Sequence, residues 1–78
     1  MSKNTSTLDD NNPYKTASTM GEAAIVTGRQ LAQMSNFCGT IGEASFITDN
    51  QKQDTIYGLL TNSMNALLVD FQEWIALP

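Results

Sequence analysis

The stretch Thr55–Leu77, TIYGLLTNSMNALLVDFQEWIAL, decides the fold. Its large apolar residues follow one another at spacings of three and four, which place them on one side of a helix with 3.6 residues per turn. Leu68 and Ile75 widen this stripe, and a helix that is so apolar on one side needs another protein surface to pack against. The predicted interface, for self-association or for a partner, consists of Tyr57, Leu60, Met64, Leu67, Leu68, Phe71, Trp74 and Ile75.

A second helix is predicted upstream, from about residue 19 to about residue 42. Thr19 is followed three residues later by Glu22, which is the spacing of a capping box and marks a helix start. A stripe with the same spacing of three and four runs along this segment, so the helix also has one apolar side. The stripe consists of Met20, Ala24, Thr27, Leu31, Met34, Cys38 and Ile41.

Small residues form a further stripe on the first helix. Gly28 and Ala32 belong to it, and we expect them to let another helix pack closely, because packing must recover the roughly 1 kcal/mol that an interior glycine costs a helix. Gly39 and Gly42 either continue this stripe or end the helix with a left-handed glycine cap.

The two helices predict an all-α hairpin over residues 19–78. The second helix is expected at about residues 49–77, after capping residues near Thr48, and a short connection makes the two helices antiparallel neighbours. Each helix has a broader apolar surface than one neighbour can cover. Two hairpins are therefore expected to pair into a homodimeric four-helix bundle.

Residues 1–18, MSKNTSTLDDNNPYKTAS, differ in composition from the rest of the chain. Leu8, Tyr14 and Ala17 are nearly the only apolar residues among many polar ones, too few to offset the entropy of ordering. The segment is predicted to be a flexible N-terminal arm. It is either a solvated tail or a segment that becomes ordered on a partner, with Pro13 and Tyr14 as its anchor.

Length and composition favour oligomerisation. A chain of 78 residues forms at most one domain, whose core contributes only about 3–5 kcal/mol without further support. The single cysteine cannot form an internal disulfide, and the absence of histidine leaves no credible metal site. Association with another chain is the remaining means of support.

Charge and hydropathy exclude several classes of partner. Four basic and eight acidic residues give a net charge of −4, so no basic face exists to bind nucleic acid or an anionic membrane surface. No apolar run approaches the roughly 20 residues of a membrane-spanning helix, and the N-terminus lacks the apolar core of a secretion signal. We expect a cytoplasmic location.

Catalytic groups are scarce, so we expect no enzymatic activity and no cofactor. The thiol of Cys38 lies on an apolar stripe with no basic residue at helical spacing, whereas a nucleophilic cysteine needs a cation, a base or a helix N-terminus. Asp70 and Glu73 are either a solvated, weakly repulsive pair or, in the case of Asp70, an anchor for an arginine of a partner.

The leading functional hypothesis is a small acidic interaction protein. It would associate with itself and bind, inhibit or regulate a host or cognate protein, as small proteins of phages and other mobile elements do. The alternative is an oligomer that sequesters a small anionic, nucleotide-like ligand between hairpins. In that case Arg29 and Lys52, with the glycine-lined backbone of Gly39–Gly42, would contact the ligand.

Overall fold

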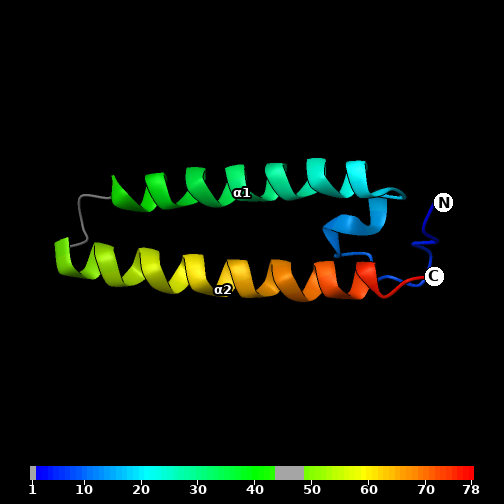
Figure 1. Cartoon of the computed structure of the whole chain (residues 1–78). Coiled ribbons are helices and arrows are strands. Elements are labelled where there is room, and N and C mark those ends of the chain that lie inside the picture. The colour runs from blue at the N-terminus through cyan, green and yellow to red at the C-terminus, as the bar shows by residue number, and fades with distance from the viewer. Residues whose placement is uncertain (1, 44–48) are drawn as a thin grey trace.

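Two long helices that lie side by side make up most of the molecule (Figure 1). The computed structural model describes residues 2–43 and 49–78, and helices α1 (Met20–Gly42) and α2 (Asp49–Ile75) run antiparallel along its 49 Å length. A short 3-10 helix, η1 (Pro13–Thr16), lies between their ends. The described ranges contain no strand. The predicted all-α fold with two helices is confirmed, and the two helices are arranged as a hairpin.

Helix α1 begins at the predicted capping box. The hydroxyl of Thr19 accepts a hydrogen bond of 3.2 Å from the amide of Glu22, and the carboxylate of Glu22 accepts one of 3.3 Å from the amide of Ser18. The helix ends at Gly42. In the described part of the chain no glycine has a positive φ, so the predicted left-handed glycine cap is absent there.

Helix α2 ends at Ile75, two residues before the predicted end. The ammonium of Lys3 donates hydrogen bonds of 3.1 Å to the carbonyl of Ile75 and 2.7 Å to that of Leu77, and lies 5.1 Å from the centre of the Trp74 ring. A cation at this end of a helix stabilises the unpaired carbonyls, and its position over an indole adds a cation–π attraction. The N-terminal segment thus supplies the basic group that the last turn of α2 lacks.

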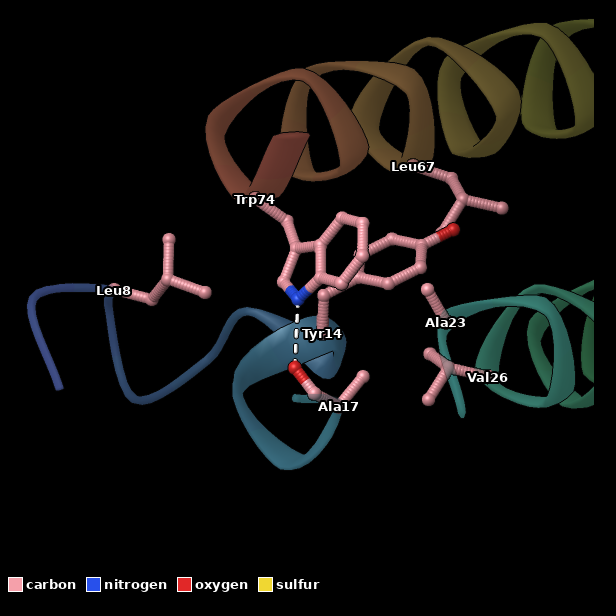
Figure 2. Close-up of a cluster of buried hydrophobic side chains, with 7 residues drawn as sticks. All are labelled: Leu8, Tyr14, Ala17, Ala23, Val26, Leu67 and Trp74. Carbon is pink, nitrogen blue, oxygen red and sulfur yellow. Dashed lines mark hydrogen bonds between the residues drawn. The ribbon is translucent and has the colours of Figure 1, made fainter. Parts of the chain in front are cut away.

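Residues 2–18 pack against both helices, so the prediction of a flexible arm is not confirmed. Leu8, Tyr14 and Ala17 are buried between the ends of α1 and α2 (Figure 2). The indole nitrogen of Trp74 donates a hydrogen bond of 2.7 Å to the carbonyl of Ala17. The arm has few apolar residues, but they lie where the helix ends leave space beside an aromatic cluster. The buried cluster consists of Leu8, Tyr14, Ala17, Ala23, Val26, Leu67 and Trp74.

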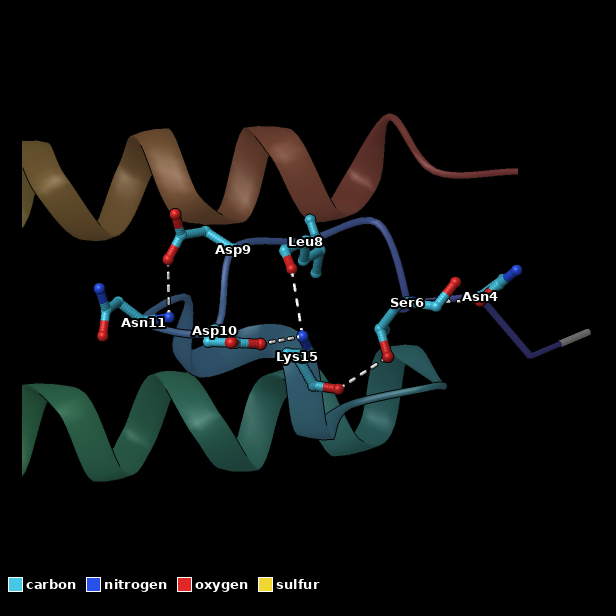
Figure 3. Close-up of polar contacts among 8 residues, drawn as sticks. Asn4, Ser6, Leu8, Asp9, Asp10, Asn11 and Lys15 are labelled. Atoms are coloured by element: carbon cyan, nitrogen blue, oxygen red, sulfur yellow. Dashed lines mark hydrogen bonds and ion pairs between the residues drawn. The ribbon is translucent and has the colours of Figure 1, made fainter.

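Polar contacts within the arm hold its turns (Figure 3). Lys15 forms an ion pair with Asp10 and also donates to the carbonyl of Leu8 at 3.3 Å. The carboxylate of Asp9 accepts from the amide of Asn11 at 2.8 Å. Asn12 begins η1, because its side chain accepts from the amide of Tyr14 at 2.8 Å and Pro13 follows it. These contacts give the arm a defined path between the helices.

The core lies at the arm end of the hairpin. The rings of Tyr14, Phe71 and Trp74 pack together with centroids 5.4–6.2 Å apart. In the other half of the hairpin, where α1 ends and α2 begins, no hydrophobic side chain among the described residues is fully buried. Two helices alone leave that half partly open. The described helices include none that is both long enough and apolar enough to cross a membrane.

Candidate interaction surface

The structure divides the predicted interface of α2 between the core and the surface. Leu67 and Trp74 are buried within the chain, and Leu60 and Phe71 are half-buried. The other four residues are exposed, because the contact of α2 with α1 is centred to one side of the predicted stripe. These exposed residues are Tyr57, Met64, Leu68 and Ile75.

Exposed apolar residues of both helices lie on one side of the hairpin, whereas Ile25, Phe37 and Val69 are exposed elsewhere. On α2, Tyr57, Met64, Leu68 and Ile75 are spaced by seven, four and seven, so they lie on the same side of the helix. On α1, Met20 and Leu31 are also exposed, and Leu31 lines the same groove as Met64 and Leu68. We call this surface the apolar face. It consists of Leu31, Met64 and Leu68, which line the groove, and of the exposed residues that lie on the same sides of their helices by helical spacing, Met20, Ala24, Tyr57 and Ile75.

A groove of about 290 Å³ lies in the apolar face. Leu67, Phe71 and Tyr14 line it together with the exposed residues at its sides. Its hydroxyl groups are already paired, because Tyr14 and Thr27 share a hydrogen bond of 2.6 Å and the Thr27 hydroxyl donates to the carbonyl of Ala23 at 3.0 Å. The groove therefore offers apolar contact and few unused polar groups, which suits apolar side chains of another protein.

A larger groove of about 510 Å³ has a different lining. Gln30, Gln33, Ser63 and Asp70 contribute polar groups to it, beside the exposed ring of Phe37. Burial raises the pKa of the Asp70 carboxyl, and the negative charges of Glu73 and Asp9 raise it further. The two grooves thus differ in chemistry, because one is almost wholly apolar and the other mixes apolar side chains with polar groups and a carboxylate.

The predicted ligand residues are not brought together. Arg29 lies on α1 in the half near the arm, where it lines a shallow pocket of about 190 Å³ with Glu22 and Ile25. Residue 52 lies in the first turn of α2, at the opposite end of the hairpin. The side chain of Lys52 is outside the described residues.

The small residues predicted for close packing face away from the partner helix. Gly28 and Ala32 are exposed, and a Cβ atom added at Gly28 would meet nothing within 4 Å. Within one chain they therefore make no close helix contact, because α1 turns Ala23, Val26 and Met34 toward α2 and the arm. Any close packing at Gly28 would involve another chain.

Chemistry-bearing groups do not gather in the described part of the chain. The thiol of Cys38 is half-buried and free of disulfide bonding, and no group of three histidine, cysteine, aspartate or glutamate residues described here is placed to hold a metal ion. The surface with the most distinctive chemistry is the apolar face.

Tyr14 is buried beneath the apolar face and lines its groove, although the sequence predicts that it lies in a flexible segment. The signal that locates it is local: Asn12 before Pro13 is a favoured helix start, and this start brings Tyr14 into the first turn of η1. The spacing of Leu8, Tyr14 and Ala17 by six and three shows no helical period, so it gave no indication of burial.

Comparisons with family models, with curated proteins and with solved structures find no match to this chain. A functional inference must therefore come from the chemistry of the apolar face and its groove.

Proposed function

We propose that this protein is a small, acidic, non-enzymatic interaction module that binds other protein chains through the apolar face. The protein associates with itself into a homodimeric four-helix bundle. It also regulates or inhibits another protein in the cytoplasm of a bacterial or phage-infected cell. The observation that carries the proposal is the apolar face itself, in which six large apolar side chains are each about half exposed or more: Met20, Leu31, Tyr57, Met64, Leu68 and Ile75.

The arrangement of these side chains favours a protein partner. Scattered exposed apolar residues are normal on a protein surface, but a contiguous apolar stripe along two helices is typical of an interaction site. Its groove is lined by leucine, methionine and phenylalanine, side chains that adapt to the apolar face of a helix. The ligand-sequestering alternative lacks comparable support, because Arg29 and residue 52 lie in opposite halves of the hairpin.

Photo-crosslinking from two neighbouring positions tests this proposal. Leu68 and Val69 are 53% and 50% exposed, but they point to different sides of α2, and only Leu68 lines the apolar groove. A benzophenone amino acid at position 68 in expressing cells should form discrete adducts with protein chains on illumination. The same group at position 69 should form far fewer.

The absence of any protein adduct at position 68, in cells and in the purified protein, would contradict the proposal. Equal labelling at positions 68 and 69 would also contradict the proposal. It would show that other proteins collide with both sides of α2 and do not prefer the apolar face. Circular dichroism of both variants would establish that the helices are intact.

A further inference from the structure

We infer that the occupant of the apolar face is a second copy of this chain, so that two hairpins pack face to face through Leu31, Met64 and Leu68. This inference rests on the proposed function, because it names the partner of the same surface. Three observations support it: the exposed area, the distribution of charge and the uneven burial along the hairpin.

The exposed area matches what a dimer needs. A compact protein of this mass, 8.5 kDa, exposes about 4,700 Å² of surface by the usual scaling with mass. This chain exposes 5468 Å². The excess of about 800 Å² equals the area that one partner contributes to a standard protein interface.

The distribution of charge allows two acidic chains to meet at this face. The chain carries a net charge of −4, yet no member of the apolar face is charged. On α2, Asp70 lines the other groove. A twofold contact places the same surface against itself, so the face must not repel its own copy. An uncharged apolar face meets this requirement, and it offers a basic partner no carboxylate.

Burial along the hairpin shows where a second chain is needed. The arm acts as a third layer at one end, where Tyr14 and Ala17 complete the core. The half of the hairpin away from the arm is less well covered. Among its described residues, the apolar side chains turned toward the other helix are only half-buried. Examples are Ile41, Ile56 and Leu59. The apolar face continues into this half through Tyr57, which is 60% exposed. A second hairpin would cover the end that the arm does not reach.

Face-to-face packing also explains the chemistry of the groove. Met64 and Leu68 stand at the side of a groove that accepts apolar side chains, so two copies related by a twofold axis can each place these side chains in or beside the groove of the other. The neighbouring helices across such a contact can run antiparallel, as in other four-helix bundles. The groove of mixed lining that contains Asp70 remains outside the contact.

Sedimentation equilibrium of the full chain, with two matched variants, tests the inference. The unmodified chain should sediment at twice its monomer mass. Leu68→Glu places a charge on the apolar face and should weaken self-association by about 100-fold or more, because each dimer carries the change twice. Val69→Glu adds the same charge at a similarly exposed position off the face, and its dissociation constant should change by less than about twofold.

Two outcomes would overturn the inference. A chain that remains monomeric up to about 1 mM excludes a functional dimer. If position 68 nevertheless forms cross-links to a different protein, the proposed binding of another protein stands, and self-association is excluded. A dimer that tolerates Leu68→Glu, in a variant whose circular dichroism shows intact helices, excludes the apolar face as its interface. Absence of both the dimer and the cross-links would overturn the proposed function as well.

Discussion

Trp74 connects the three parts of the molecule. Its side chain is 1% exposed and packs on Tyr14 from the arm and Phe71 from its own helix. Its indole nitrogen donates to the carbonyl of Ala17, and Lys3 lies over its ring. One residue thus provides α2 with an apolar contact, a hydrogen bond and a cation–π contact to the segment that precedes α1.

Trp74→Phe should destabilise the protein by about 1–3 kcal/mol, because the carbonyl of Ala17 would lose its donor in a buried position. Urea denaturation followed by circular dichroism at a fixed protein concentration measures this loss. Val69→Ala, at an exposed position of the same helix, is the control and should change the free energy of unfolding by less than about 0.5 kcal/mol. A Trp74→Phe variant as stable as the parent would show that the hydrogen bond contributes nothing.

Asp70 predicts a pH dependence of stability. Burial first, and then the charges of Glu73 and Asp9, raise the pKa of Asp70 above its ordinary value of 3.8. The folded state therefore holds this proton to higher pH than the unfolded state does. The resulting stability is fully present below the unfolded pKa and is lost as the pH rises through the folded pKa. Asp10 acts in the opposite sense, because its hydrogen bond with Lys15 and the charge of Lys15 lower its pKa.

Asp70→Asn should therefore raise the melting temperature at pH 7 and reduce the decline in melting temperature above pH 3.8. Thermal unfolding from pH 3 to pH 8 measures both effects. Asp54→Asn, an exposed position on the same helix, removes an equal charge and serves as the control. A lower melting temperature for Asp70→Asn at pH 7 would mean that the ionised carboxylate is favoured in the folded protein.

At the scale of the elements, the arm is part of the fold. Removal of residues 1–18 would expose Trp74 and the adjoining surface of α1, and should cost at least about 3–5 kcal/mol, which is most of the stability of so small a domain. Circular dichroism should show weaker helical signal, and the emission of Trp74 should shift to longer wavelength. A truncated chain with unchanged stability and emission would contradict the observed packing.

Two neighbouring substitutions test whether the arm stabilises the protein through the packing of a buried side chain, and not only by being present. Leu8 is buried and Thr7 is exposed, so Leu8→Asn should reproduce part of the loss caused by truncation. Thr7→Asn should leave the melting curve almost unchanged.

The helices could be predicted from the sequence because their signals are local. Thr19 and Glu22 mark the start of α1 by a contact within a single turn, and the stripe of α2 extends through more than five turns. The side of each helix that packs against the neighbouring helix was less predictable. Tyr57 and Leu67 belong to one stripe, yet one is exposed and the other buried, because a broad apolar sector does not specify which of its sides meets the neighbouring helix.

The packing of the arm could not be predicted from the sequence, because its contacts are distant in sequence. Lys3 and Tyr14 reach α2 residues more than 50 positions away. Composition describes only how much apolar surface a segment contains. It does not show that a matching gap exists between two helix ends.

At the scale of the whole molecule, the chain is unusually extended. Its radius of gyration is 15.3 Å, against about 11.5 Å for a compact domain of this length. Two helices in one layer have two broad sides, and the arm fills only one end between them. In this chain one side carries the apolar face, and the other carries the groove of mixed lining that contains Asp70 and the exposed ring of Phe37.

Self-association predicts that stability depends on concentration. Because a second chain that binds only the folded state stabilises it by mass action, a rise of about 100-fold in protein concentration should raise the melting temperature by several degrees. Scanning calorimetry and circular dichroism together cover that range. Leu68→Glu should melt at a temperature that does not depend on concentration, whereas a concentration-independent parent would argue against a dimer.

The contact of the arm with the end of α2 also has a consequence for synthesis on the ribosome. Lys3, Leu8 and Tyr14 are translated early, but the Trp74 ring and the Ile75 and Leu77 carbonyls that receive them are translated more than 50 residues later. While the ribosomal exit tunnel encloses those later residues, the arm has no docking site and α1 no helical neighbour. The nascent chain therefore exposes Tyr14 and the inner side of α1 until the last turn of α2 has left the exit tunnel.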